Sequence, residues 1–117
     1  MRRGEIYRVR RPPGDTKPAR SFVIVSRQAL IDSNYSTVVC APIFSERYGL
    51  PTQANVGTAE GLKHDSAIHC DGLMSIEKSR LTDYVGELSE DKDAELDKTL
   101  QVALALTTEK SRKGARG

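Results

Sequence analysis

Arg20 is the residue whose position most favours chemistry on a phosphate ester. It stands where a proline-rich loop, residues 11–18, gives way to the apolar run 21–26. A guanidinium carries its N–H donors in a fixed fork and can hold two phosphate oxygens at once. The simpler interpretation is a solvated charge at a strand end, and composition alone leaves both open.

Ser45 is the second candidate, because it directly follows an apolar run that ends at Phe44. A hydroxyl at a strand end can donate a hydrogen bond to a phosphoryl oxygen. It can equally be an ordinary turn residue, since serine is common in turns. The charged residues Glu46 and Arg47 come next in the chain.

The two histidines, His64 and His69, form a third candidate pair. Imidazole titrates near neutrality and can transfer protons during RNA cleavage. The expected strand 66–70 contains His69 and begins after His64. Their relative geometry does not follow from this spacing, and a loop or strand-face histidine is the competing interpretation.

No set of residues has the spacing of a metal or cofactor site. Cys40 and Cys70 lack the CxxC pattern of zinc sites and are expected to be reduced core thiols. Asp65, Asp71 and Glu77 are close in sequence, but their spacing singles out no metal site. The sequence also lacks a glycine-rich phosphate loop and a dinucleotide fingerprint. We therefore expect no metal and no cofactor.

Charge is unevenly distributed along the 117 residues, although the formal net charge is only +2. Residues 1–27 contain eight basic and two acidic residues, whereas residues 28–106 contain six basic and thirteen acidic ones. Residues 107–117 contain four basic residues and one acidic residue. The pattern excludes a uniformly basic chromatin-type protein and an acidic disordered chain, and it is compatible with a polyanion bound on one side of a small domain.

The chain has the length of one domain. Its apolar runs are far shorter than the ~20 residues that span a bilayer, and residues 1–5 are not followed by the apolar segment of a secretory signal. We therefore expect a cytoplasmic protein with no membrane partner. The domain is placed at residues 1–106, and residues 107–117 are expected to form a basic, disordered tail.

Short apolar and β-branched runs predict six or seven strands before residue 89. They are residues 5–10, 21–26, 36–43, 52–56, 66–70, 73–76 and 84–88, with one helical turn over 28–33. Alternation in the first strand puts Tyr7 and Val9 on the core side and Ile6 on the polar side with Arg8. Pro42 predicts an edge or a bulge near the end of the third strand.

The hydrophobic period changes after residue 88. Ser89 suits an N-cap, and acidic residues at 90, 91 and 93 suit the first turn of a helix. One helix face then carries Leu96, Leu100, Ala103 and Leu104, and we expect the helix to end near Leu106. Strands followed by one helix predict a mainly β fold, a partly open barrel with a C-terminal helix.

The order of these segments resembles that of the MazF/PemK-like toxins of bacterial toxin–antitoxin pairs. Four stretches carry the resemblance in register over residues 2–106: RRGEIY at 2–7, PARSFVIVS at 18–26, VVCAPI at 38–43 with the loop into LPT at 50–52, and HCDGLMSIEKSRL at 69–81. The resemblance implies an SH3-like, partly open barrel that forms a homodimer and binds a cognate antitoxin.

The same resemblance implies an activity. Many members of this family cleave single-stranded RNA at specific sequences without a metal, leaving 2′,3′-cyclic phosphate and 5′-hydroxyl ends. Their strand-initiating arginine and a Thr or Ser after the third strand serve the scissile phosphate, and these positions fall on Arg20 and Ser45. Flanking RNA contacts are then expected from Lys17, Phe44, Arg47 and Asp71.

The chain departs from the family pattern at three places. Ser21 replaces a common proline, Phe44 stands where a threonine often follows the third strand, and Asp71-Gly72 replaces a common Glu-Gln pair. These departures motivate an alternative, a non-catalytic barrel that poisons DNA gyrase or binds promoter DNA with its antitoxin. A histidine-based nuclease of an unrelated kind is a third possibility.

Overall fold

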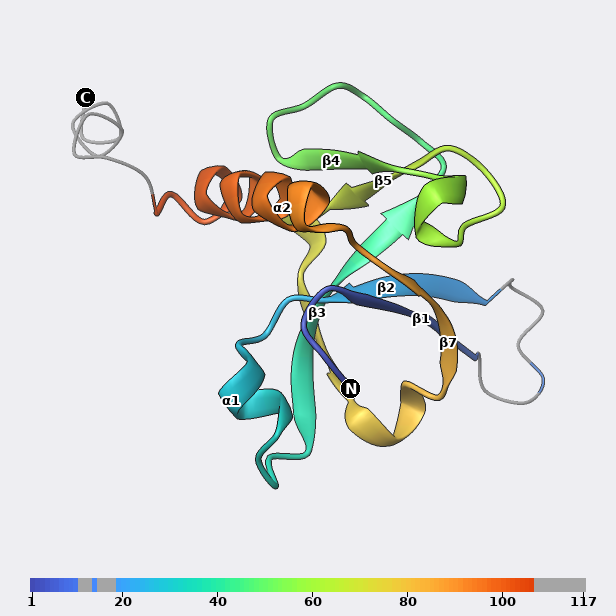
Figure 1. Ribbon diagram of the computed structural model, residues 1–117, viewed down its shortest axis with the longest axis vertical. Helices are drawn as coiled ribbons and strands as arrows, with labels where there is room; N and C mark the ends of the chain where they lie inside the picture. The colour runs from blue at the N-terminus through green and yellow to red at the C-terminus, as the bar shows by residue number, and fades with distance from the viewer. Residues whose placement is uncertain (11–13, 15–18, 107–117) are drawn as a thin grey trace.

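A single curled antiparallel sheet with a C-terminal helix forms the fold (Figure 1). The computed structural model describes residues 1–10, 14 and 19–106, and within these ranges the sheet has seven strands. The strands are β1 (Glu5–Val9), β2 (Arg20–Ile24), β3 (Thr37–Phe44), β4 (Gln53–Val56), β5 (Ser66–His69), β6 (Met74–Glu77) and β7 (Asp83–Glu87). The helices are α1 (Gln28–Ile31) and α2 (Glu90–Ala103), with the short 3-10 turns η1 (Thr58–Glu60), η2 (Cys70–Gly72) and η3 (Lys78–Arg80). The mainly β fold with a C-terminal helix is thereby confirmed.

The central strand is β3, which lies in the strand order β4-β5-β3-β2-β1-β7 and also pairs with β6. Its first half, Thr37 to Cys40, pairs with β6, whereas its last two residues pair with β5. Pro42 lies where the partner changes, so its missing N–H leaves no ladder bond unmade on that edge. The proline therefore marks a break in pairing on one side of a central strand, while its other side pairs with Phe22 of β2, so the expected edge is wrong.

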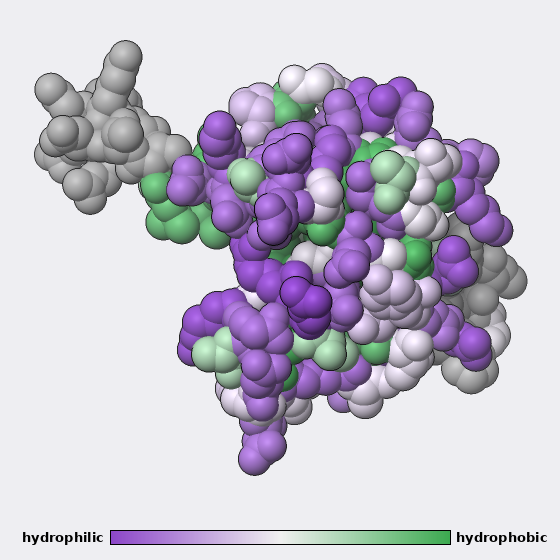
Figure 2. All heavy atoms as spheres, in the orientation of Figure 1, coloured by the Kyte–Doolittle hydropathy of each residue, from purple (hydrophilic) through white to green (hydrophobic). Residues whose placement is uncertain are grey.

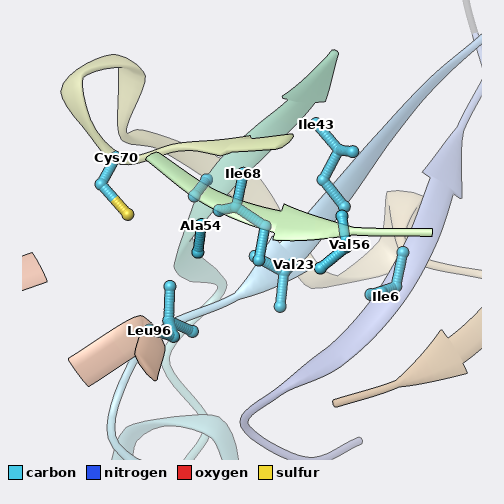
Figure 3. Packing of buried hydrophobic residues seen from close by; sticks show 9 residues of the cluster. Ile6, Val23, Ile43, Ala54, Val56, Ile68, Cys70 and Leu96 are labelled. Atoms are coloured by element: carbon cyan, nitrogen blue, oxygen red, sulfur yellow. The ribbon is translucent and has the colours of Figure 1, made fainter. Parts of the chain in front are cut away.

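Apolar side chains are buried on both faces of the sheet, in two separate clusters. One cluster fills the space beneath α2, where Leu96 meets residues of β1 to β5 (Figure 3). Its buried members are Ile6, Val23, Ala41, Ile43, Ala54, Val56, Ile68, Cys70 and Leu96. The second cluster lies on the opposite face and comprises Val9, Phe22, Ile24, Ile31, Val38, Cys40, Ile76 and Leu81.

The prediction for Ile6 is wrong, because β1 has no purely polar face. Tyr7 and Val9 contact the second cluster as expected, but Ile6 is fully buried in the first. Strict alternation assumes one solvent face, and this strand lies between two cores. Only Arg8, on the same side as Ile6, stays exposed.

Helix α2 begins as expected, since the Ser89 hydroxyl accepts a hydrogen bond from the Lys92 amide at 3.2 Å. It ends at Ala103, earlier than predicted. Leu104 is the C-cap and is half exposed, and with Val102 and Leu106 it forms a hydrophobic patch at the helix end (Figure 2). In the part of the chain that the structure describes, neither helix combines the length and hydropathy that a bilayer crossing requires.

A close backbone approach fixes the segment that follows η1. Gly61 has φ of +94°, and a Cβ built on it would lie 2.3 Å from the carbonyl oxygen of Val85 in β7. A Cβ on Gly86 would meet the Glu60 carbonyl at 2.1 Å. Two glycines therefore let η1 pack directly on β7, and this contact positions residues 62–64.

Candidate nucleic-acid interface

Arg20 is the first residue of β2 and lies beside the end of β3. The register pairs its neighbour Ser21 with Ile43, so Arg20 comes next to Phe44. The guanidinium carbon lies 4.5 Å from the centroid of the Phe44 ring, within the range of a cation–π contact. Within the ranges 1–10, 14 and 19–106, no carboxylate forms an ion pair with Arg20. The aromatic ring therefore orients the guanidinium and leaves its charge uncompensated there.

A polar groove of about 390 Å³, here called the Arg20 groove, opens beside this arginine. Its walls come from strands β1, β2, β3 and β5 and from the segment 62–64 that η1 positions. The polar side chains that line it are Arg8, Arg20, Lys63, His64, Ser21, Ser45, Ser66 and Glu46. Among the described residues, two arginines, one lysine and three serine hydroxyls face only one carboxylate in this groove, a composition that suits binding of a phosphate ester.

Ser45 lies in the same groove as Arg20, so the structure brings the two predicted catalytic residues together. The Ser45 hydroxyl is 3.4 Å from a carboxylate oxygen of Glu46, a long contact. Exchange of this contact for a bond to a bound oxyanion would cost little, because the hydroxyl is exposed to solvent. Phe44 lines the groove as well, with its ring beneath Arg20.

The two histidines have separate places. His64 lines the Arg20 groove, and His69 does not. The His69 ring packs edge-to-face on Phe44 at 4.7 Å, and its Nε2 lies 2.9 Å from the carbonyl oxygen of Glu46. A cooperating acid–base pair therefore receives no support from the geometry, since only one imidazole reaches the groove.

The remaining predicted contacts lie elsewhere. Asp71 is in η2, outside the groove, and accepts a hydrogen bond from the Thr52 hydroxyl at 2.7 Å. Arg47 borders a separate concavity together with Lys92. Lys17 lies outside the described residues. The structure thus brings three of the six predicted site residues into one groove.

Sequence reasoning missed Arg8, Lys63 and a second concavity on the other side of Arg20. That concavity, of about 230 Å³, has an apolar floor of Val9, Phe22, Met74 and Ile76 and is bordered by Arg10, Arg20 and Arg80. Arg8 could have been found from the sequence, because alternation along the first strand already placed this cation on the polar face. Lys63 could not, because its position depends on the η1–β7 contact.

No metal site is formed by the described residues, where no three His, Cys, Asp or Glu side chains converge. Cys40 and Cys70 are free and buried, each in a different core cluster, as expected for core thiols. Burial raises the pKa of Cys40 to about 12 and that of Cys70 to about 11. Burial, helped by a hydrogen bond to Glu5, raises the pKa of Tyr7 to about 12. These groups therefore stay neutral in the folded protein under ordinary conditions.

Comparison with known proteins agrees with this architecture. The chain is 27% identical over 111 residues to the endoribonuclease EndoA of Bacillus subtilis (strain 168), covering 91% of this chain and 96% of that protein. The structure of an endoribonuclease in complex with its cognate antitoxin, from Mycobacterial species, superposes with a TM-score of 0.78 at 26% identity, covering 92% of this chain and 98% of that one. The Mycobacterium tuberculosis toxin MazF-mt6 shares the fold, with a TM-score of 0.76 at 24% identity over 89% of this chain and 99% of that one.

The family model for the PemK-like, MazF-like toxins matches residues 2–104 of the 117. Its range includes every strand described above and both α-helices. The chain therefore belongs to the PemK-like, MazF-like toxin family of type II toxin–antitoxin systems.

Proposed function

We propose that this chain is the toxin of a toxin–antitoxin pair and cleaves single-stranded RNA without a metal, with Arg20 and Ser45 serving the scissile phosphate. The observation that carries the proposal is the joint presence of Arg20 and Ser45 in one cation-lined groove of a chain in this toxin family. The similarity to the Bacillus subtilis endoribonuclease EndoA supports the reaction class.

RNA brings its own nucleophile to such a groove. The ribose 2′-oxygen forms a bond to phosphorus, and the bond from phosphorus to the 5′-oxygen breaks. The 2′-hydroxyl loses its proton, and the leaving 5′-oxygen gains a proton. The products are a 2′,3′-cyclic phosphate and a 5′-hydroxyl. The protein must hold an unstacked backbone in line and stabilise the charge that builds on the phosphoryl oxygens.

Arg20 has the charge and geometry for that stabilisation. Its permanent charge meets the phosphoryl oxygens, and Phe44 holds the guanidinium at the groove wall. Arginine is a poor proton donor, because its pKa lies above ~12. Ser45 would add a hydrogen bond to the same phosphate and act as a donor, not as a nucleophile. Arg8 and Lys63 would hold neighbouring phosphates.

The partners follow from the same assignment. A cognate antitoxin that is acidic or partly disordered would cover the cationic groove, and the mycobacterial relative in complex with its antitoxin supports such a partner. We propose a homodimer that acts in the cytoplasm, and binding to promoter DNA together with the antitoxin.

The decisive experiment maps 5′-hydroxyl ends on single-stranded RNA incubated with purified protein in EDTA. We expect cuts at a recurring short sequence, and we expect Arg20→Ala to lose at least 100-fold in rate. Arg27→Ala is the matched control, since Arg27 is an exposed arginine at the start of α1 and away from the groove. Full cutting by Arg20→Ala would remove that residue from the mechanism.

A second function is favoured by one observation, the phenyl ring at Phe44 in the place where the family often has a hydroxyl. The groove would then hold a phosphate without cutting it, and the chain would act by binding DNA gyrase or nucleic acid. Intact RNA after incubation at high protein concentration, with gyrase recovered on the immobilised protein, would favour this function over the nuclease.

A further inference from the structure

Three aromatic rings continue outward from Arg20 at the end of β3. The Phe44 ring carries the guanidinium on its face, and its centroid lies 4.7 Å from that of His69 with an interplanar angle of 82°. The Tyr48 centroid lies 6.3 Å from that of His69 at 79°. These three rings, here called the aromatic row, run from the groove to the surface.

The aromatic row is held by the backbone around it. His69 Nε2 lies 2.9 Å from the Glu46 carbonyl oxygen, and the Tyr48 amide donates to the Gln53 side-chain oxygen at 3.0 Å. Gln53 and His69 are themselves register partners in β4 and β5. The loop that carries Tyr48 is thus tied to two strands, so a ligand on Tyr48 would meet a preorganised ring.

Tyr48 lies at the outer end of the aromatic row and is 67% exposed. In the described part of the chain its hydroxyl makes no hydrogen bond to another residue, and its only aromatic partner is the edge-on contact with His69. The Phe44 ring, in contrast, is covered by Arg20 on one face. The ring with a free face is therefore the one farthest from the guanidinium.

We propose that Tyr48 stacks on an unpaired base of the RNA strand whose scissile phosphate lies at Arg20, and that His69 and Phe44 support it in that position. This inference rests on the proposed function for the identity of the strand. A planar π-face accepts any base, and base–aromatic stacks are common where a cationic groove tracks a single-stranded backbone. The adjacency of the aromatic row to the Arg20 groove supplies that combination here.

The test measures binding separately from cleavage. The probe is a single-stranded oligonucleotide of 2′-deoxy nucleotides that contains the mapped cleavage sequence, or a mixed-sequence one if no cleavage is found. It lacks the 2′-hydroxyl and so is not cut. We expect Tyr48→Ala to weaken its binding by about 5- to 150-fold, the effect of one lost stack. Tyr48→Phe and Tyr48→Trp should bind like the wild type, because both keep the ring.

A matched control is Tyr35→Ala, since Tyr35 is a tyrosine of similar exposure, 61%, that precedes the start of β3, whereas Tyr48 follows its end. We expect this variant to bind as the wild type does. Two further readouts separate stacking from charge. The fluorescence of 2-aminopurine, placed at a base next to the scissile position, should be quenched by the wild type and not by Tyr48→Ala. The slope of log binding constant against log salt concentration should become shallower in Arg8→Ala and stay unchanged in Tyr48→Ala.

The outcomes of the proposal and of the proposed function are distinguishable. Absence of cleavage by the wild type, with weakened oligonucleotide binding by Tyr48→Ala, would overturn the nuclease function and keep the stacking site. Cleavage by the wild type, with equal oligonucleotide binding and equal 2-aminopurine quenching by Tyr48→Ala, would overturn the stacking site. Equal oligonucleotide binding by Tyr48→Ala together with lost binding to the antitoxin would assign Tyr48 to a protein partner and overturn it as well.

Discussion

The Arg20 guanidinium lies over the Phe44 ring, 4.5 Å from its centroid. Arg20 begins β2 and Phe44 ends β3, so the pairing of two strands brings the charge onto the ring. A residue that departs from the family pattern thus contacts the residue most strongly expected to serve the phosphate. The departure at Phe44 therefore changes how the arginine is held.

Substitution of Phe44 tests this positioning role. Phe44→Leu keeps the apolar volume and removes the π-face, and we expect kcat to fall by about 2- to 5-fold, which corresponds to the ~0.5–1 kcal/mol of an exposed cation–π contact. KM should change little, because the phosphate charge is still met. Recovery of kcat in Phe44→Tyr, measured with the same RNA, would identify the ring as the cause. A fall in thermal stability that matches the fall in kcat would point to a structural role instead.

The hydroxyl of Ser45 is the second target. We expect Ser45→Ala to lower kcat by 10-fold or more, because one donor to the developing oxyanion is lost. The double variant Phe44→Thr/Ser45→Ala should regain part of that loss, since it moves a hydroxyl to the adjacent position. Rates of single-turnover cleavage measure both. Wild-type rates for Ser45→Ala would leave Arg20 as the only assigned group.

Substitution of the histidines distinguishes histidine acid–base catalysis from the mechanism that relies on Arg20. His64→Ala should reduce binding modestly, because it lines the groove, and His69→Ala should act through the Tyr48 loop. The double variant should retain cleavage at saturating RNA within about 10-fold. Loss of cleavage by 1,000-fold in a folded double variant would favour histidine acid–base catalysis.

Arg3 makes three contacts that hold the N-terminus, two of them to helix α2 and one to the residue after β2. It donates to the Val25 carbonyl at 3.1 Å and pairs with Asp93 and Asp97 at 3.0 and 2.8 Å. We expect Arg3→Ala to lower the free energy of unfolding by about 1 kcal/mol, since the carboxylates are partly exposed. Urea unfolding measures it. Arg10→Ala is the control, because among the described residues its 80% exposed side chain makes one ion pair, which should contribute less than about 0.5 kcal/mol.

Stability should fall at alkaline pH, because burial holds the pKa of Cys40 at about 12 against 9.0 in an accessible thiol. Above pH 9 the unfolded chain releases the thiol proton and the folded chain keeps it, so the free energy of unfolding falls. The stabilisation is complete below pH 9 and is lost as pH rises toward 12. Thermal midpoints at pH 8, 9, 10 and 11 check this, and Cys40→Ala should be less stable at pH 8 but show a shallower decline. Parallel declines for both proteins would contradict it.

Much of the fold could be predicted from local pattern. Ser89 and the acidic residues after it indicated the start of α2, and the β-branched run at 21–26 indicated a strand. The side of Ile6 could not be predicted, because it depends on a second core that alternation does not reveal. The end of α2 at Ala103 likewise follows from packing, since the apolar repeat continues into Leu104, which no core residue covers.

The candidate site was predictable where one residue had both a strand-end position and a charge. Arg20 met that condition, Ser45 had the strand-end position and a hydroxyl in place of a charge, and the structure brings the two residues into one groove. Asp71 and Arg47 were expected from the family resemblance, but the pairing of strands, which the local pattern does not reveal, places them outside the Arg20 groove. The aromatic row was missed for the same reason: Phe44, Tyr48 and His69 become neighbours only when β5 pairs with β3.

One side of β3 pairs first with β6 and then with β5, and this arrangement determines how the sheet opens. One strand holds β6 through its first half and β5 through its last residues, and it contributes side chains to both cores. Thermal opening that frees the Phe44 end must therefore loosen the β5 ladder as well. Hydrogen exchange of Ile43 and Ile68 should then follow a common, nearly global unfolding event, and the groove wall built on β3 should be among the last parts of the protein to exchange.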